Sequence, residues 1–320
     1  MTELSRRAFL KAAMAGTVAL AGDMSFAEEP GKSLVVEVRS ARWRNEGGAA
    51  DSAVIREMLD SGVARLTGKS SAKGAWSALI SPGETVGLKF NRISRDFTGA
   101  NQAIVDAVAA GLKSAGVKQN DIIVVEAEGV EFAGGRPKPG WAGEYQFASG
   151  KTRLSNFLVN QVDALINVPN LKHHPLAGFT GCLKNISHAN DTIMDKPGNF
   201  HRNACNPYIA DIYAIDAVRS KVRLQLMNAL VGIFDRGAHP RSPTWQWAHG
   251  GLLLSVDPVA VDALGAALVD THRAKHEGKA VRRDPRALRY LDAASERGLG
   301  ECDPERIRHV VVDLEGSVST

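Results

Sequence analysis

The sequence predicts a single large α/β domain in which a largely parallel sheet carries helices on both faces. Short runs of apolar, β-branched residues alternate with longer stretches of helical periodicity, which is the order of βαβ units. Beyond a short N-terminal leader, about 290 residues remain, and this length is enough for one large hydrophobic core. We therefore expect one α/β domain without internal repeats.

Strands and helices alternate in the first half of the chain. The predicted elements there are strands 34–38, 85–90 and 122–126 and helices 52–66 and 101–114. Gly116 ends the second helix, and Asn120-Asp121 leads into the strand that follows. Residues 129–143 are rich in glycine and proline and are too long for a simple connection, so either a lid or rim of a site or a disordered excursion is expected there.

The second half repeats this order. Its predicted elements are strands 164–168, 222–229, 252–256 and 307–313 and helices 208–218, 258–274 and 285–297. Asp257 directly before Pro258 indicates a helix start, because a carboxylate cap precedes proline at the first helical position. The polar stretch between Val168 and Asn206 is expected to be irregular.

The first residues of the chain carry an export pattern. Ser5-Arg6-Arg7-Ala8-Phe9-Leu10-Lys11 contains an adjacent arginine pair before a weakly apolar run, and Ser25-Phe26-Ala27 has the small residues of a cleavage site. The segment resembles a twin-arginine (Tat) signal peptide, which implies export to the periplasm by the Tat translocase, often after folding around a cofactor. We expect residues 1–27 to be the signal peptide and residues 28–320 the α/β domain.

Composition excludes several classes of partner and cofactor. The net charge is +4, and no basic stripe is interleaved with aromatic residues, so nucleic acid is not expected as a partner. No apolar stretch after the leader has membrane-spanning length, so the mature chain is not expected to be an integral membrane protein. Cys182, Cys205 and Cys302 form no Cys-x-x-Cys pair, which disfavours a protein-bound iron–sulfur cluster. A Cys182–Cys205 disulfide and the oligomeric state stay open.

Histidines are concentrated directly after predicted strand 164–168. His173, His174, His188 and His201 are four of the nine histidines and lie within thirty positions. Open α/β sheets bind ligands at the carboxyl ends of their strands, and imidazole is a common ligand of transition metals. The segment therefore predicts a site for a transition metal such as nickel, iron or zinc, with His174 and His201 as the favoured ligands.

Lysine and asparagine side chains accompany these histidines. Lys172 and Lys184 could bind a phosphate or carboxylate, or could simply be solvated. Lys89 and Asn91 lie at the end of predicted strand 85–90 and point to the same face, because side chains alternate along a strand. They could meet Asn185 and the two lysines across the sheet and help to bind an anion.

Other charged residues occupy neighbouring positions. Arg92 and Arg95 suit recognition of carboxylate or phosphate, and Glu126 and Glu128 at the end of the next strand are alternative acid/base groups. Asp262 lies in an apolar helix, where a buried carboxylate needs a charge or a donor as its partner. A lysine or arginine side chain could supply that partner.

Four runs of residues carry a family resemblance. They are Gly87-Leu88-Lys89-Phe90-Asn91, Val168-Pro-Asn-Leu-Lys-His-His174, Lys184-Asn185 and Ser255-Val-Asp-Pro-Val-Ala-Val-Asp-Ala263. Over nearly the whole mature chain they resemble the family described only as domain of unknown function 362. Phe90 and His173 depart from the family's usual proline and threonine. Many relatives carry ferredoxin-type cysteines that this chain lacks, so electron transfer through its own clusters is not implied.

A shorter segment resembles a second family. The run from His174 to Lys184, followed by Thr192-Ile193-Met194 and His201, is similar to the cofactor segment of nickel-pincer lactate racemases. That resemblance implies a lactate-racemase-like fold, with His174 as general acid/base, Lys184 as the lysine that carries the pincer nucleotide and His201 as a metal ligand. The chain departs from the pattern at Cys182, where the family has glycine.

We expect an exported, metal- or cofactor-dependent oxidoreductase or isomerase that acts on a small anionic, hydroxy-acid-like substrate by redox chemistry or proton or hydride transfer. The predicted site residues are His174, Lys184 and Asp262 for catalysis, Lys184, Lys89, Asn91, Lys172 and Asn185 for binding a cofactor, and His201, His174, His188 and His173 for a metal. A non-catalytic periplasmic protein that binds a metal or small ligand, or an accessory subunit of a redox complex, is the alternative. Replacement of Lys184 discriminates between them, because a carrier would keep its metal.

Overall fold

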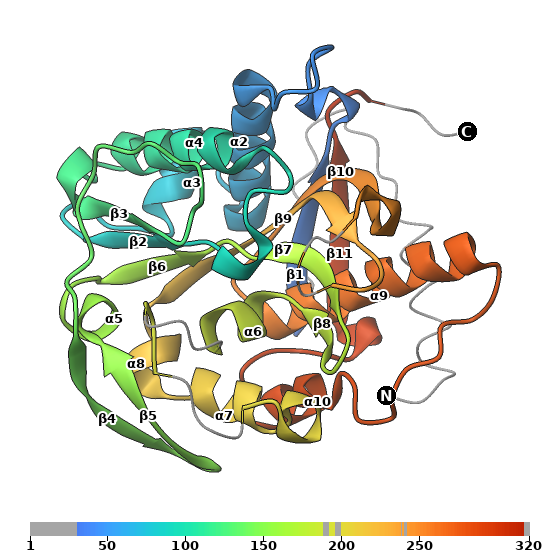
Figure 1. The fold of residues 1–320 in the computed structure, drawn as a ribbon. Coiled ribbons are helices and arrows are strands. Elements are labelled where there is room, and N and C mark those ends of the chain that lie inside the picture. The colour runs from blue at the N-terminus through green and yellow to red at the C-terminus, as the bar shows by residue number, and fades with distance from the viewer. Residues whose placement is uncertain (1–30, 188–191, 196–199, 238, 240–241, 317–320) are drawn as a thin grey trace.

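A mixed sheet runs through the centre of the molecule (Figure 1). The computed structural model describes residues 31–187, 192–195, 200–237, 239 and 242–316, and within them nine strands form one sheet of central order β11-β1-β10-β9-β6-β2-β3, in which β7 pairs with β9 and β8 with β7. These strands are β1 (Ser33–Arg39), β2 (Val86–Lys89), β3 (Ile122–Val125), β6 (Ala164–Asn167), β7 (Asn170–His174), β8 (Gly178–Thr180), β9 (Val222–Ile233), β10 (Gln246–Ser255) and β11 (Ile307–Asp313). The predicted signal peptide lies outside the described residues.

Most neighbouring strands of the sheet run parallel. The pairs β1–β11, β2–β3, β2–β6, β6–β9 and β7–β9 are parallel, whereas β10 is antiparallel to both β1 and β9, and β8 is antiparallel to β7. The prediction of a largely parallel sheet is confirmed. Two of the three antiparallel pairs, β7–β8 and β9–β10, arise where the chain returns directly, since a short connection can join only antiparallel neighbours.

Helices cover both faces of the sheet (Figure 1). On one face lie α2 (Ser52–Thr67), α3 (Ala72–Ser77) and α4 (Asn101–Ser114). On the other lie α5 (Asn156–Asn160), α6 (Cys182–Ser187), α7 (Tyr208–Tyr213), α8 (Asp216–Arg219), α9 (Pro258–Glu277) and α10 (Arg289–Glu296). Two hydrophobic clusters result, one beneath α2 to α4 and one beneath α6, α7, α9 and α10. A central sheet with a hydrophobic core on each face agrees with the fold class that the sequence predicts.

The long helices begin and end at residues with capping chemistry. Asp51 caps α2 by accepting the N–H groups of Ala53 and Val54, and α2 ends at Gly68 in the left-handed conformation. Asp257 caps α9 through the N–H groups of Val259 and Ala260, which confirms the predicted helix start at Asp257-Pro258.

Several predicted boundaries differ from the structure. A two-stranded sheet of β4 (Trp141–Phe147) and β5 (Gly150–Ser155) follows the expected loop and includes its last residues. Many β4 side chains are half-buried or exposed, so the strand has little apolar patterning. The predicted helix 208–218 is two short helices, α7 and α8. The last helix starts at Arg289 instead of residue 285, because Leu288 has a φ of 69° and interrupts a right-handed helix.

The polar stretch between Val168 and Asn206, predicted to be irregular, contains β7, β8 and α6. All five residues of β7, all three of β8 and all six of α6 are buried. A polar stretch is thus folded into the interior of the domain, where each polar side chain needs a partner.

A charged side chain is buried on β1, near one edge of the sheet. Glu37 of β1 is fully buried, and its two carboxylate oxygens lie 2.6 Å from Nε2 of His249 on β10 and 2.7 Å from Nε2 of His309 on β11. Arg39 donates to the same carboxylate at 2.6 Å. Burial alone would raise the pKa of Glu37, but the hydrogen bonds from His249 and His309 and the nearby positive charge hold it well below its usual value. This cluster joins three neighbouring strands.

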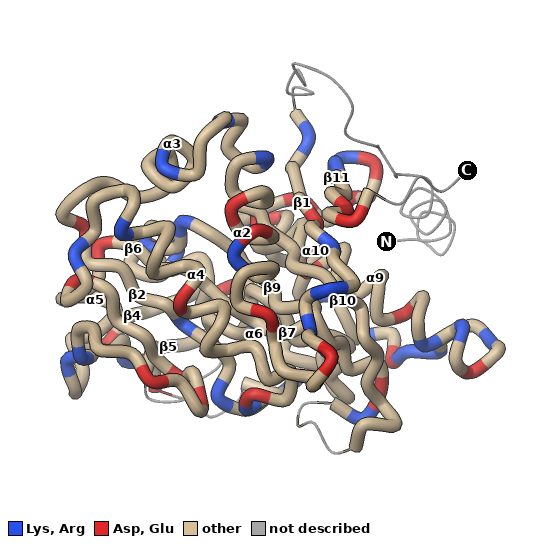
Figure 2. The backbone as a smooth tube through the Cα atoms, turned by 90° about the horizontal axis from the view of Figure 1, so that it is seen from above, with Lys and Arg blue, Asp and Glu red and all other residues tan. Residues whose placement is uncertain are grey.

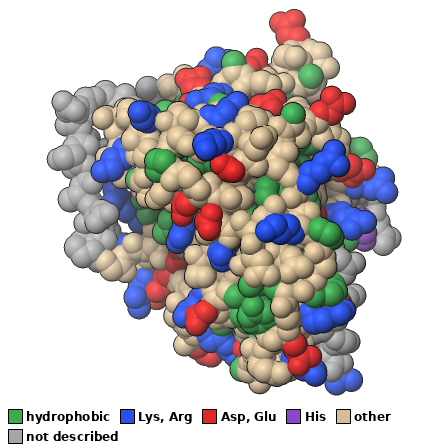
Figure 3. Space-filling view, turned by 90° about the vertical axis from the view of Figure 1, so that its left-hand side faces the viewer, with side chains coloured by type: hydrophobic (Ala, Val, Ile, Leu, Met, Phe, Trp, Pro, Cys, Tyr) green, Lys and Arg blue, Asp and Glu red, His purple; other side chains and the backbone are tan. Residues whose placement is uncertain are grey.

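Charges of both signs are interspersed over the surface. Lys and Arg alternate with Asp and Glu along the backbone seen from above (Figure 2), and the same mixture covers the face shown in Figure 3. In the described part of the chain, no helix is long and apolar enough to cross a membrane. Cys182, Cys205 and Cys302 are free thiols, so the disulfide that the sequence left open is not formed.

Candidate functional site

Three lysines are buried beside the carboxyl ends of β2 and β6. Lys89 is the last residue of β2, Lys172 lies in β7 and Lys184 lies in α6, and their exposed fractions are 1%, 1% and 2%. Lysine is almost never fully buried unless it has a partner, because its ammonium group loses hydration. The three side chains therefore identify a specialised polar region at the edge where α/β sheets bind ligands.

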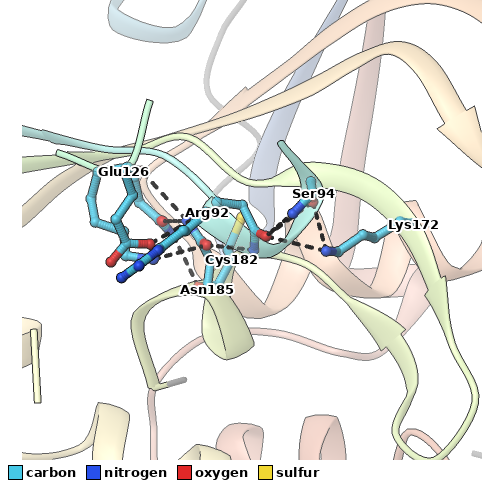
Figure 4. Close-up of polar contacts among 9 residues, drawn as sticks. Arg92, Ser94, Glu126, Lys172, Cys182 and Asn185 are labelled. Atoms are coloured by element: carbon cyan, nitrogen blue, oxygen red, sulfur yellow. Dashed lines mark hydrogen bonds and ion pairs between the residues drawn. The ribbon is translucent and has the colours of Figure 1, made fainter. Parts of the chain in front are cut away.

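Asn185 of α6 connects the residues that the sequence places on separate elements (Figure 4). Its Oδ1 accepts hydrogen bonds from Nζ of Lys89 at 3.1 Å and from Nδ2 of Asn91 at 2.8 Å. Its Nδ2 donates to Oδ1 of Asn167 at 2.7 Å. The expected meeting of Lys89 and Asn91 with the Lys172–Lys184 segment therefore occurs, with Asn185 at its centre.

Further buried amides hold α6 against the sheet. Asn167 at the end of β6 donates to the carbonyl oxygen of Cys182 at 2.9 Å and to Oε1 of Gln225 at 2.7 Å. Gln225 in turn donates to the hydroxyl oxygen of Tyr213 at 3.0 Å. Sequence reasoning missed Asn167 and Gln225, although a polar residue within a buried apolar strand is a signal for such a role.

Lys172 is held at the far end of this network. Its Nζ donates to Oγ of Ser94 at 2.6 Å and to Oδ1 of Asn91 at 3.2 Å (Figure 4). Burial and the positive charges of Lys184 and Lys89 lower the pKa of Lys172 to about 7. A lysine with this pKa exchanges its proton near neutral pH.

Lys89 has a carboxylate partner. Its Nζ lies 3.0 Å from Oε2 of Glu126, and both side chains are almost completely buried. Burial lowers the pKa of Lys89, while the charge and hydrogen bond of Glu126 act in the opposite direction. Glu126 follows β3 and has a φ of 60°, an uncommon backbone conformation for a residue with a side chain.

His174 is held as a neutral imidazole. Its Nδ1 accepts the backbone N–H groups of Leu176 and Ala177, both at 3.1 Å, so the proton of the neutral ring is on Nε2. Burial and the nearby charges of Lys184, His201 and Lys172 lower the pKa of His174 to about 2. Its ring stacks on His201 with centroids 6.1 Å apart. His174 is thus a hydrogen-bond donor through Nε2.

Thr180 adds a hydroxyl that sequence reasoning did not single out. It pairs directly with Lys172 across β7 and β8, so the two side chains share one face of the sheet. Its Oγ1 is buried and makes no hydrogen bond within the described residues. Lys184 lies near the same region, with its Nζ 5.0 Å from the ring centroid of Phe200. Ammonium, hydroxyl and imidazole donors thus gather at β7.

Residues 144–267, from β4 into α9, match the sequence family of the domain of unknown function (DUF362). Over this segment the chain is similar to the DUF362 family. The matched segment contains Lys172, His174 and Lys184, whereas Lys89 and Glu126 precede it. A comparison with curated proteins finds no match. The buried lysine network is thus built jointly by the DUF362 segment and the strands before it.

The four histidines predicted as metal ligands do not all converge in the described part of the chain. His173 lies on the opposite face of β7 from His174, with its Nδ1 3.8 Å from Oδ1 of Asp235, and burial and Arg283 lower its pKa to about 4. His188 lies outside the described residues. Within the described ranges, no three histidine, cysteine or acidic side chains are grouped so that they could hold a metal ion. The metal site stays a prediction.

Asp262 of α9 interacts with the backbone, not with the lysine or arginine that the sequence suggested. Its carboxylate accepts the N–H groups of Cys182 at 2.5 Å and Leu183 at 3.0 Å and so caps α6. Burial raises the pKa of Asp262 to about 7, although the two backbone donors favour the charged form. Gly181 leaves room for this contact, since a Cβ there would overlap Oδ1 of Asp262. Asp262 thus positions the helix that carries Lys184 and Asn185.

Proposed function

We propose that this protein is an exported enzyme that binds a small anionic, hydroxy-acid-like substrate beside Lys172 and Lys184 and moves a proton on it. The observation that supports this proposal is the burial of three lysines near enough to one another for the charges of Lys184 and Lys89 to act on Lys172. Lys184 and Lys89 lower the pKa of Lys172, and a bound anion would offset that repulsion. The proposal of export depends on the residues at the N-terminus.

The proposed chemistry divides between two side chains. Lys172, with a pKa of about 7, both accepts and releases a proton at neutral pH and suits the role of general acid/base. His174, neutral and protonated on Nε2, donates a hydrogen bond to a substrate oxygen on which negative charge develops. Its low pKa makes it a poor acceptor of a full proton, so this assignment moves the acid/base role from His174 to Lys172.

A transition metal or a pincer nucleotide remains part of the proposal through the sequence resemblance. When bound, such a group would supply a Lewis acid or a hydride acceptor. The described side chains alone do not form a three-ligand metal site, and we therefore assign no step to a metal. Elemental mass spectrometry and intact mass of protein purified without chelators test this part. Stoichiometric nickel with added mass on Lys184 would support the pincer nucleotide, and an unmodified, metal-free protein would contradict both groups.

Binding of glycolate is expected to take up protons. The anion would bind the charged form of Lys172, so affinity should fall about tenfold per pH unit above 7, and uptake should approach one proton per glycolate at alkaline pH. Calorimetric titrations from pH 6 to pH 9, each in two buffers of different ionisation enthalpy, measure both quantities.

Two lysine variants complete this experiment. Lys172→Met should weaken glycolate binding about tenfold or more at pH 6, because it removes a charged hydrogen-bond donor, and should abolish proton uptake. Lys151→Met is the matched control, because Lys151 is exposed on β5 and far along the chain from the network. A pH-independent affinity without proton uptake in the unmodified protein would contradict the role of Lys172.

A further inference from the structure

A cleft of about 610 Å³ lies against the outer side of the Lys89–Glu126 pair. Its lining includes Arg92, Arg95, Glu126, Glu128 and Thr192. This volume is in the range of pockets that take a small organic ligand. The two arginines and two glutamates follow the carboxyl ends of β2 and β3, which is again the edge where α/β sheets bind ligands.

The floor of the cleft contains a carboxylate oxygen without a partner. The Glu126 side chain is 3% exposed, and its Oε2 accepts from Nζ of Lys89 at 3.0 Å and from the backbone N–H of Arg92 at 3.4 Å. Its other oxygen, Oε1, is buried and makes no hydrogen bond in the part of the chain that the structure describes. Buried carboxylate oxygens are normally hydrogen-bonded, so Oε1 is suited to a donor on a ligand in the cleft.

The rest of the lining indicates the charge of that ligand. The Arg92 side chain is exposed and extends beside Glu126 (Figure 4), and the Arg95 side chain is 77% exposed, 4.0 Å from Glu128. Guanidinium groups bind carboxylates with two parallel hydrogen bonds. A ligand that fits both features has a carboxylate for an arginine and a hydroxyl that donates to Glu126.

We propose that this cleft is a second ligand site, distinct from the one proposed beside Lys172 and Lys184, that binds a hydroxylated carboxylic acid. The hydroxyl donates to Oε1 of Glu126, and a carboxylate of the same ligand pairs with Arg92. Glu126 then has a partner on each oxygen, Lys89 on the inner side and the ligand on the outer side. The site therefore discriminates between acids that carry a hydroxyl at this position and acids that lack it.

L-malate and succinate test this proposal, because they differ by a single hydroxyl group. Calorimetry with the purified protein should show malate binding about tenfold tighter than succinate, the effect of one hydrogen bond to a charged acceptor. Glu126→Gln should reduce this preference to less than about threefold, since its amide oxygen faces Lys89 and its amide nitrogen faces the cleft. Glu128→Gln, on the exposed rim, is the matched control and should keep the preference.

Variants at the arginine and at the lysines complete the test. Arg92→Ala changes an exposed side chain and should not affect folding. It should weaken the binding of malate and the binding of succinate by the same factor. Lys172→Met should leave the preference for malate unchanged. Equal affinities in the unmodified protein, absence of malate binding at millimolar concentrations, or a preference that survives Glu126→Gln would overturn the assignment. Loss of malate binding in Lys172→Met alone would place the ligand among the lysines and leave the proposed function intact.

Discussion

Replacement of Asp262 by alanine is expected to lower the free energy of unfolding by about 2–5 kcal/mol, because two buried backbone N–H groups lose their acceptor and a cavity forms. These donors belong to Cys182 and Leu183 in the first turn of α6. The same helix carries Lys184 and Asn185, so glycolate binding should weaken by more than about tenfold. Urea denaturation gives the stability, and calorimetry gives the affinity.

Three companion variants show whether the effect passes through α6. Asp257→Ala removes the cap of α9, at a cost of about 0.5–2 kcal/mol, and also removes the acceptor of Ser33 and Glu301; it should keep glycolate binding because the hydrogen bonds of Asp257 are made to these residues and to α9. Gly181→Ala should resemble Asp262→Ala, since the added methyl group overlaps the carboxylate. Asp262→Asn keeps one acceptor oxygen, so its free energy of unfolding and its glycolate affinity should lie between those of the unmodified protein and those of Asp262→Ala. Normal glycolate binding in a folded Asp262→Ala protein would show that Asp262 does not position the site.

The elements that the sequence predicts well are those with a local pattern. Helix α4, predicted over residues 101–114, spans Asn101–Ser114, and α9 begins at the predicted Asp257-Pro258 cap. In both cases apolar periodicity and capping residues lie within one short stretch of chain. Strands β2 and β6 are equally visible because they are short, buried runs that are apolar up to their last residues, Lys89 and Asn167.

The region around β7 could not be predicted in this way. Asn170–His174 is a buried strand that contains a lysine and two histidines, so it shows neither alternation nor an apolar run. These polar residues can be buried because residues on other elements form hydrogen bonds with them, as Ser94 does with Lys172. Partners distant in sequence leave no local signal.

Several residues of the candidate site could be selected from the sequence, but the hydrogen bonds between them could not. Lys89, Asn91 and Lys172 could be selected because they follow predicted strands, and the structure brings them together. Asn185, the common partner of Lys89 and Asn91, also donates to Asn167 through the other end of its amide, which spacing cannot reveal. Asp262 was selected as a buried carboxylate, but its partners are backbone N–H groups, which no residue type indicates.

Replacement of Glu37 by glutamine is expected to lower the free energy of unfolding at pH 7 by about 3–5 kcal/mol, the usual effect of removing one partner from a buried charged network. The change leaves His249 and His309 against a neutral amide that cannot accept from both. Glu57→Gln on the exposed surface of α2 is the matched control, and its free energy of unfolding should stay within about 0.5 kcal/mol of that of the unmodified protein. Urea denaturation of the three proteins measures these differences.

The pH dependence of the same difference tests its electrostatic origin. The pKa of Glu37 is lower in the folded protein than in the unfolded chain, so its charge contributes stability fully above the unfolded value, near 4.5, and loses that contribution as the pH falls toward the folded value. The difference in free energy of unfolding between the unmodified protein and Glu37→Gln should therefore shrink below pH 4.5 and stay constant just above it. A difference that persists unchanged in acid would arise from packing, and the Glu37 charge would then have no part in joining the three strands.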